Sequence, residues 1–280
     1  MSQFYEFFGI TRQAHCKARK RVQQQGVIFE RIRSFIQSER RTHSGGGLKK
    51  LYHQMADKSV GRDRFIAYAT KAGLAQRRRK KHIRTTFSIF TVFTNLLANQ
   101  TLTNINQAWS GDITYIRVGE KHGYVFLLMD IYSRRILGYV ASDSMSASVN
   151  ILCLKMALSV RKGQSLKNTI HHSDRGVQYI AGDYLLMLQE RKFQISMCCS
   201  ALDNPFSERV NGILKEEYLD NYQFENLTEL EKVLEISVQH YNNRRPHLNL
   251  NMMTPIEFEK QLVNVLIDQR IKVIIAPEHK

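Results

Sequence analysis

Three carboxylates occupy positions at which an open sheet gathers functional groups. Asp112 lies inside a stretch of β-branched and aromatic residues, Trp109–Tyr115, which is typical of a strand. Asp174 directly follows another expected strand, and Glu208 lies near the start of a helix that Asn204 can cap. Strand ends and helix starts are common places for catalytic side chains. These three acids are therefore the first candidates for a catalytic site.

Carboxylates in this pattern suit a divalent metal site. Mg²⁺ prefers oxygen ligands and keeps several waters, so two or three carboxylates and a substrate phosphate can hold it. Two such ions roughly 3.5–4 Å apart can activate the attacking oxygen and stabilise the leaving oxygen in phosphodiester chemistry. No nucleophilic side chain is then needed. We therefore interpret Asp112, Asp174 and Glu208 as candidate catalytic and metal-binding residues.

Other charged residues near these positions have to be weighed against them. Asp130, inside an apolar strand, is a rival ligand, but we favour a structural role for it. Glu216 and Glu217 could replace Glu208 only if their helix were rotated to expose its apolar face. Lys215 shares a stripe with Glu208 about two turns away, where it could contact a DNA phosphate. The apolar face of that helix is expected to contain Phe206, Val210, Ile213 and Leu214.

The hydrophobic pattern from Trp109 onward predicts the elements that position the acids. Three antiparallel strands should be followed by alternating helices and strands, which is an α/β arrangement. The expected strands cover 113–118, 124–131, 135–141, 168–172 and 193–197, and the expected helices cover 146–160, 182–191 and 204–218. The buried side of the first of these helices should contain Val149, Leu152, Cys153, Met156 and Ala157.

The positive charge of the chain is concentrated in its first third. The net charge is +16, and residues 1–86 contain 21 Lys or Arg but only 5 Asp or Glu. Residues 87–280 contain 20 of each kind and are neutral overall. A basic segment attached to a neutral body indicates phosphate neutralisation and hence nucleic-acid binding. A merely soluble basic surface would not explain this segregation.

The basic segment is expected to be helical. Thr11 should cap a helix that ends at Gly26, and a second helix should cover 27–41. After a flexible break at 44–47, two short helices are expected at 48–55 and 61–72, with Gly73 as a left-handed cap.

Two short helices around a tight turn fit a helix-turn-helix, although many small helical bundles share the pattern. The second helix carries Arg62, Arg64 and Lys71. The dense run Arg77, Arg78, Arg79, Lys80 and Lys81 follows, and we interpret it as a linker along DNA. A nuclear-localisation signal or a plain solvated run is the weaker alternative for it.

Composition limits the remaining possibilities. No apolar run reaches the roughly 18–20 residues that span a bilayer, and the N-terminus lacks a secretory signal pattern. We expect a soluble, cytoplasmic protein. The four cysteines, Cys16, Cys153, Cys198 and Cys199, form neither a disulfide framework nor a zinc spacing, and we expect them to be small buried hydrophobes.

The chain resembles the bacterial insertion-sequence transposases encoded as the downstream of two overlapping frames, which carry a retroviral-integrase-like catalytic core. Five ordered segments carry the resemblance, covering 109–115, 133–138, 172–179, 203–217 and a tail signature within 241–255. The resemblance spans about residues 105–260. It departs from the family in one place: 33 residues lie between Asp174 and Glu208, where the family usually has two more. The shortening falls in the 198–202 loop, which should tolerate it.

The resemblance implies a ribonuclease-H-like fold, with a mixed five-stranded sheet flanked by helices, after an all-α basic domain of helix-turn-helix type. It implies domains at 1–86, including a linker at 77–86, and at 105–260, with a tail at 261–280. Two Mg²⁺ or Mn²⁺ ions would be bound by Asp112, Asp174 and Glu208, and Lys215 would occupy the position of the family's basic DNA contact. We also count Arg175 among the DNA-binding candidates.

The implied function is that of a DDE transposase, a polynucleotidyl transferase with endonuclease activity. It would nick the ends of a mobile element to free a 3′-hydroxyl and use that hydroxyl to attack another DNA strand. Implied partners are the element ends and target DNA, further copies of the chain on DNA, and an upstream-frame protein or fusion, in a nucleoid-associated bacterial protein. The alternatives are a catalytically silent DNA-binding derivative and a metal nuclease that cuts without joining.

Overall fold

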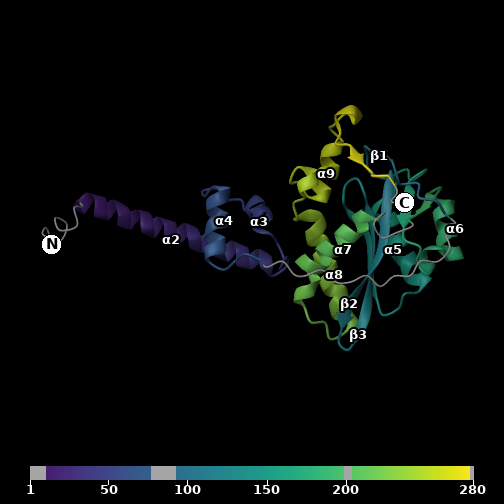
Figure 1. Cartoon of the computed structure of the whole chain (residues 1–280), viewed down its shortest axis with the longest axis horizontal. Coiled ribbons are helices and arrows are strands. Elements are labelled where there is room, and N and C mark those ends of the chain that lie inside the picture. The colour runs from purple at the N-terminus through teal and green to yellow at the C-terminus, as the bar shows by residue number, and fades with distance from the viewer. Residues whose placement is uncertain (1–10, 77–92, 199–203, 278–280) are drawn as a thin grey trace. The chain divides into compact units, whose positions relative to one another are not determined.

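The computed structural model describes residues 11–76, 93–198 and 204–277 of the 280-residue chain. It divides into two compact units, Met1–Arg78 and Arg79–Lys280 (Figure 1). The finer boundaries expected at residues 86, 105 and 260 stay a prediction. No helix in the described ranges is both long and apolar enough to cross a membrane.

The described part of the first unit, residues 11–76, contains three helices. They are α2 (Arg12–Arg40), α3 (Leu48–Gln54) and α4 (Arg62–Lys71). The Thr11 hydroxyl accepts a hydrogen bond from the Ala14 amide at 3.1 Å, so the predicted N-cap is confirmed. The predicted break at Gly26 is wrong, because α2 runs through it without interruption.

Packing explains why α2 continues past its glycine. A glycine in a helix interior costs roughly 0.5–1 kcal/mol relative to alanine, which weakens a helix without ending it. Beyond Gly26, α2 buries Ile32 and Ile36 against Leu51 and Phe65 of the two shorter helices. This apolar contact stabilises the C-terminal half of the helix, and the propensity of a single residue does not override it.

The two short helices agree with the expected pair. Gly73 has φ +71° and ends α4, as predicted for a left-handed cap. The Leu74 amide donates back to the Ala69 carbonyl at 2.8 Å, which closes the end of the helix. The turn between the helices packs through Met55 and Val60, both of which are buried.

The second unit is built on a five-stranded mixed sheet. Its strands are β2 (Ala108–Val118), β3 (Lys121–Asp130), β4 (Ile136–Ser142), β5 (Ile170–Ser173) and β6 (Gln194–Met197). They lie in the order β4-β3-β2-β5-β6, with β2, β3 and β4 antiparallel and β5 and β6 parallel to β2. The predicted strand order along the chain and the mixed sheet are confirmed.

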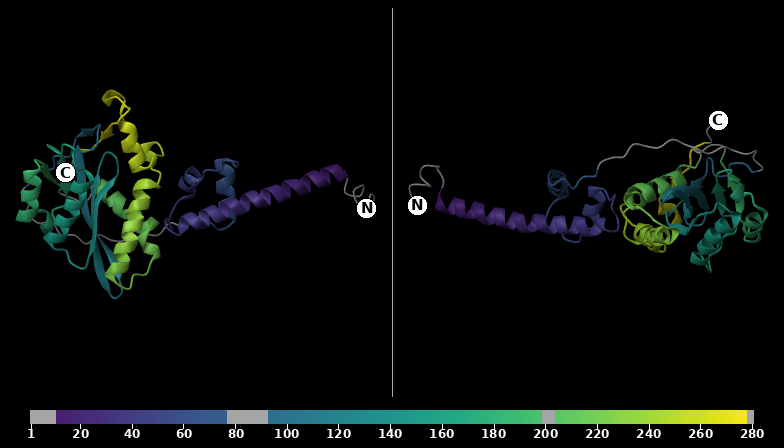
Figure 2. Two further views of the ribbon diagram at one scale, coloured as in Figure 1. Left: turned by 180° about the vertical axis from the view of Figure 1, so that it is seen from behind. Right: turned by 90° about the horizontal axis from the view of Figure 1, so that it is seen from below.

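Helices cover both faces of the sheet (Figure 2). The inward residues of one face, such as Leu127, pack against α7 (Pro205–Glu217) and α8 (Leu227–Asn243). Residues of the other face, such as Phe126, pack against α5 (Ala147–Val160) and α6 (Gly182–Glu190). The helix α9 (Pro255–Leu262) follows α8 and lies beside it. The sheet is thus the middle layer of three.

One expected core residue of α5 is exposed. Leu152 is 54% exposed, whereas Leu154 is fully buried. The buried stripe of α5 contains Asn150, Cys153, Leu154 and Ala157, which follow the i, i+3, i+4, i+7 spacing of one helix face. Leu152 lies off this stripe, so its apolar character alone gave the wrong assignment.

The C-terminal tail packs in part against the second unit. β7 (Val273–Ile274) pairs antiparallel with β1 (Thr101–Leu102), and Ile275 is buried. Ile271 and Val273 of the tail contact the core, whereas Ile267 is 64% exposed. Among the described residues, short 3₁₀ helices connect the larger elements at Val177–Tyr179, Leu219–Asn221, Leu248–Leu250 and Ile267–Gln269.

The described cysteines are free. Cys153 and Cys198 are buried, as expected, but Cys16 is exposed on α2. The expectation for Cys16 is wrong because this part of α2 contacts neither of the shorter helices through an apolar residue. Cys199 lies outside the described residues.

Candidate active site

The register of β2 and β5 brings two of the predicted acids together. These strands are parallel neighbours, and Ser110 lies opposite His172. Asp112 follows two residues after Ser110 on β2, and Asp174 follows two residues after His172, directly beyond the end of β5. Parallel neighbours are roughly 4.8 Å apart, which places the two carboxylates at the same part of the sheet.

A buried hydrogen-bond network fastens the start of α7 to β2. The Ser110 hydroxyl donates to Asn204 Oδ1 at 2.6 Å and bonds the Ser207 hydroxyl at 2.5 Å. Asn204 Nδ2 also donates to the Gly111 carbonyl at 3.3 Å. Glu208 directly follows Ser207, so the network that anchors this turn also sets the position of the third acid.

Asn204 therefore has a different role from the predicted one. It is the N-cap residue of α7, and Pro205 opens the helix, but the Asn204 side chain makes no capping hydrogen bond. Its amide is used instead to hold β2. Since both of its polar atoms bond to the strand, the side chain is not available to the helix amides.

A second contact connects α7 to Asp112 directly. Asn211, one turn after Glu208, donates from Nδ2 to Asp112 Oδ2 at 2.7 Å. The Ile113 amide donates to the other oxygen of Asp112 at 2.9 Å. Sequence reasoning gave Asn211 no role. A polar residue one turn after a catalytic acid was the signal that could have identified it.

The environment of Asp112 strongly favours its protonated form. Burial raises the pKa of Asp112 to about 7, together with the nearby charges of Asp174 and, more weakly, Glu208. The hydrogen bonds from Ile113 and Asn211 act in the opposite direction but do not offset burial. The three predicted acids therefore interact electrostatically.

Asp174 shares this environment. Burial raises its pKa, although the Gly176 amide, which donates to Asp174 Oδ1 at 3.0 Å, lowers it. Glu208 is exposed on α7. Within the described part of the chain, no three His, Cys, Asp or Glu side chains converge closely enough to enclose a metal ion as they stand.

The donor set nevertheless fits a divalent cation. Asp112 and Asp174 are partly buried, and neither forms an ion pair with a described cationic residue. The raised pKa values of these two adjacent carboxyl groups indicate that the surrounding side chains do not balance their negative charge when they ionise. A hard, oxygen-binding cation such as Mg²⁺ would balance it, and Glu208 on the neighbouring helix turn could supply the third carboxylate.

The rival acids are engaged elsewhere. Asp130 is fully buried and bonds Arg161 at 3.3 Å, in agreement with the structural role that we favoured. Glu217 forms an ion pair with Arg245 at 2.7 Å. Glu216 is exposed.

The predicted DNA-binding residues fall into three groups. Lys215 is close enough to Asp112 for that charge to act on it: burial lowers the pKa of Lys215, while Asp220 and then Asp112 raise it. Arg175 adjoins Asp174 and is partly buried. Arg62 and Arg64 are exposed on α4 of the first unit. The run Arg77, Arg78, Arg79, Lys80 and Lys81, together with the rest of the 77–86 linker, lies outside the described residues.

Sequence reasoning missed the aromatic ring of Tyr179, which packs beside the acids. A Cβ atom added to Gly111 would lie 3.3 Å from the Tyr179 ring, so the glycine admits this buried tyrosine beside Asp112. Burial and the charges of Asp174 and Asp112 raise the pKa of Tyr179, which keeps its hydroxyl neutral. His171, next to this ring, has its pKa lowered to about 3 by burial and by His172. The side chains of Tyr179 and His171 are therefore uncharged at neutral pH.

The sequence of this chain is similar to those of known proteins. Two integrase core domain models match residues 103–201 and 192–255. An insertion element IS600 protein of 31 kDa from Shigella sonnei is 33% identical over 79% of this chain and 84% of its own length. The transposase for insertion sequence element IS629 from the same species is 30% identical over 78% of this chain and 75% of its own.

The chain belongs to the insertion-sequence transposases with an integrase core. It is therefore an enzyme of the polynucleotidyl-transferase type, a DDE transposase that acts in the transposition of an insertion sequence. Integrase-like cores of this type depend on divalent metal ions.

The fold of the transposase agrees with this assignment. A chain of the simian T-cell lymphotropic virus intasome, solved in complex with PP2A regulatory subunit B56 gamma, aligns with a TM-score of 0.52. The alignment covers 80% of this chain and 72% of that chain at 14% identity, which shows likeness of fold. The ribonuclease-H-like sheet inferred from the sequence is confirmed.

Proposed function

We propose that Asp112, Asp174 and Glu208 are the metal ligands of this transposase and hold two Mg²⁺ or Mn²⁺ ions. The observation that carries the proposal is the register of β2 and β5, which aligns Asp112 with Asp174. The Ser110 network supports it, because it fixes the turn that bears Glu208 against the same strand. The bound ions would activate the attacking oxygen and stabilise the leaving oxygen of a phosphodiester.

The surrounding side chains would orient these ligands and the DNA. Asn211 holds Asp112 Oδ2, which fixes the direction in which the carboxylate faces. Lys215 lies on the same helix, and the charge of Asp112 acts to raise the pKa of Lys215. Its ammonium is therefore close enough to the acids to contact a phosphate beside the metals. Arg175, next to Asp174, would act in the same way. The neutral side chains of Tyr179 and His171 add no charge that would compete with the bound ions.

The proposed substrates are the ends of the element and the target DNA. The first 86 residues carry all of the excess positive charge, which supports phosphate binding there. Arg62 and Arg64 on α4 would contact DNA, and Arg77, Arg78, Arg79, Lys80 and Lys81 would follow its backbone. Action on two element ends also implies more than one copy of the chain on DNA, with or without an upstream-frame segment.

The decisive test compares the wild type with Glu208→Gln and Glu216→Gln. Glu216 lies on the same helix and is exposed, so its substitution makes the same chemical change outside the proposed site. The purified proteins would be incubated in Mg²⁺ with labelled duplex that carries the element ends. We expect the wild type and Glu216→Gln to join strands and Glu208→Gln to lose joining by several orders of magnitude.

Other outcomes would change the assignment. Normal joining by Glu208→Gln would remove Glu208 from the site. Cutting without joined products would indicate a nuclease. If no protein nicked or joined DNA, the assay would be repeated with the upstream segment fused to the chain, and continued inactivity would indicate a silent DNA-binding derivative.

A further inference from the structure

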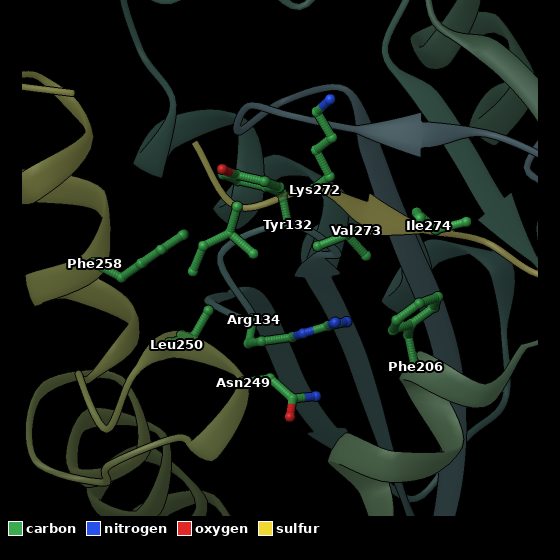
Figure 3. Close-up of a pocket in the computed structure, with 10 residues that line it drawn as sticks. Tyr132, Arg134, Phe206, Asn249, Leu250, Phe258, Lys272, Val273 and Ile274 are labelled. Carbon is green, nitrogen blue, oxygen red and sulfur yellow. The ribbon is translucent and has the colours of Figure 1, made fainter. Parts of the chain in front are cut away.

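A cavity of about 280 Å³ lies beside the first turn of α7 (Figure 3). Its walls come from the turn after β3, the start of α7, the 3₁₀ helix at Leu248–Leu250, α9 and the tail strand β7. The residues that line it are Tyr132, Arg134, Phe206, Asn249, Leu250, Phe258, Ile271, Lys272, Val273 and Ile274. None of the three proposed metal ligands lines this cavity.

The cavity is apolar at its base and positively charged in its wall. Leu250 and Phe258 are buried in the core below it, and Arg134 brings a cation to its wall, whereas the exposed Lys272 directs its ammonium away from the other lining residues (Figure 3). No carboxylate lines it. Arg134 forms no ion pair with a described residue, and its guanidinium lies 4.4 Å from the centroid of the Phe206 ring. The positive charge of Arg134 is thus available to an anionic ligand.

The backbone holds Arg134 in an uncommon conformation. Its φ of +62° lies in the left-handed region, which a residue with a side chain adopts rarely and at some cost. This conformation places the guanidinium over Phe206, between the turn and α7 (Figure 3). The fold therefore maintains the pair of a cation and an aromatic ring at this wall despite an unfavourable backbone.

A buried hydroxyl at the cavity has no partner. Tyr132 is 1% exposed, and its Oη makes no hydrogen bond in the described structure. Burial raises the pKa of Tyr132, whereas the nearby charge of Arg270 lowers it. Arg270 also has a buried nitrogen, Nη1, without a hydrogen-bond partner. Buried polar groups are nearly always bonded, so each orphan indicates a missing ligand or water; of the two residues, only Tyr132 lines the cavity.

These features together define the ligand. An aromatic ring with a stacked guanidinium accepts a planar ring, the apolar base excludes water from it, and the Arg134 guanidinium attracts a phosphate. A nucleotide combines a planar ring with a phosphate. A base inside a duplex presents neither of its faces, so the nucleotide must be unpaired before its ring can enter.

We propose that this cavity binds an unpaired nucleotide of the DNA strand that passes the catalytic acids. The inference rests on the proposed function, because the DNA must first be held at Asp112, Asp174 and Glu208. Phe206 and Glu208 are two residues apart on α7, and therefore point in roughly opposite directions from the helix axis. A strand that crosses the first turn of α7 would reach the acids on one side and the cavity on the other.

The test measures binding in EDTA, so that it does not depend on catalysis. The probe is an element-end duplex with a short single-stranded 3′ extension that contains 2-aminopurine, and its comparison is the same duplex with a blunt end. We expect Phe206→Leu to weaken binding of the extended duplex by about tenfold, since stacking on an aromatic ring is of that size. Binding of the blunt duplex should be unchanged, and so should both affinities in Lys155→Gln, an exposed lysine on α5.

A second variant separates ligand binding from structural support. Tyr132→Phe removes only the hydroxyl that lacks a partner, so the melting temperature should stay the same or rise. We expect it to weaken binding of the extended duplex several-fold and to leave the blunt duplex unaffected. Quenching of 2-aminopurine by the wild type, reduced in Phe206→Leu, would report stacking directly.

Several results would overturn the proposal. One is equal binding of the two duplexes by the wild type, and another is an equal loss of both affinities in the variants. Lack of quenching, or a fall in melting temperature without any change in binding, would assign the cavity to packing alone. Failure of the catalytic assignment would be recognised separately, by normal joining in Glu208→Gln, because the binding test contains no metal.

Discussion

The side chain of Asn211 donates a hydrogen bond of 2.7 Å to Oδ2 of Asp112, and so joins the helix that carries Glu208 to the strand that carries the first acid. The contact lies one turn beyond Glu208, whereas the Ser110 network lies just before it. Glu208 is therefore held between two attachments to β2. The distance between the first and third acids depends on both.

Substitution of Asn211 should weaken metal binding without removing a ligand. Asn211→Ala leaves Asp112 with one fewer donor, so its carboxylate can rotate away from the orientation that the metal requires. We expect the Mg²⁺ concentration for half-maximal DNA cleavage to rise about 10- to 100-fold, the usual effect of removing such a supporting contact. Asn243→Ala, at the exposed end of α8, is the control. An unchanged Mg²⁺ requirement would assign Asn211 to folding alone.

The pair Ser110 and Asn204 should show energetic coupling. Both side chains are buried, and removing either leaves the other with an unsatisfied polar atom. We expect Ser110→Ala and Asn204→Ala each to lower the free energy of unfolding by about 1–3 kcal/mol. The double variant should lose less than the sum, and urea denaturation of all four proteins measures the difference. Strict additivity would show that the bond contributes nothing.

The order of the elements could be predicted because the second unit follows simple periodicities. Apolar and β-branched runs identified the strands, and the acids could be located at strand and helix ends. The parallel register that aligns Asp112 with Asp174 could not be derived in this way, because it depends on pairing between strands far apart in the sequence. Resemblance to known motifs supplied the grouping of the acids instead.

The errors arose where tertiary contacts outweigh local preference. Gly26 was expected to end a helix, but contacts of Ile32 and Ile36 with the shorter helices carry α2 through it. Asn204 has a good capping residue type, yet its amide bonds Ser110 and Gly111. Which of two possible partners a side chain contacts depends on its neighbours in the folded protein. A local sequence pattern does not contain that information.

The buried cluster around Glu259 should be structural and independent of metal. Glu259 accepts hydrogen bonds from Arg135 at 2.6 Å and from Arg161 at 2.8 Å, and Arg161 also reaches Asp130. Glu259→Gln would leave buried arginine charge uncompensated, so we expect a loss of roughly 3–5 kcal/mol in the free energy of unfolding. Glu231→Gln, exposed on α8, should change little.

The same cluster tests the role of Asp130. In Asp130→Asn the free energy of unfolding should fall, but the Mg²⁺ concentration for half-maximal cleavage should not change, because Asp130 bonds Arg161 and backbone amides. A raised Mg²⁺ requirement in this variant would instead support Asp130 as a metal ligand.

Two glycines should respond in opposite directions to substitution by alanine. A Cβ on Gly138 would lie 2.2 Å from the Cys153 carbonyl, so β4 or α5 must shift, and we expect a marked loss of stability in the second unit. A Cβ on Gly26 meets nothing within 4 Å, and alanine should stabilise α2 by about 0.5–1 kcal/mol. Circular dichroism during thermal unfolding measures both. Destabilisation by Gly26→Ala would mean that the glycine has a conformational role that the continuous helix does not reveal.

The raised pKa of Asp112 should make metal-free stability depend on pH. Because the pKa is about 7 in the folded protein and near 3.8 ordinarily, the folded state binds the proton more tightly between these values. Its stabilising contribution is complete below the ordinary pKa and is lost as pH rises through about 7. In EDTA, the free energy of unfolding of the wild type should therefore fall over this window, and Asp112→Asn should show a smaller fall.

Added Mg²⁺ should have the opposite dependence, because it binds the deprotonated carboxylates. We expect it to stabilise the wild type most above pH 7 and to stabilise Asp112→Asn little at any pH. Asp143→Asn, in an exposed loop, should behave as the wild type does in both conditions. If the wild type and Asp112→Asn instead lost stability in parallel as pH rose in EDTA, the protonation of Asp112 would not be the cause. Urea titrations at several pH values, with and without Mg²⁺, distinguish these outcomes.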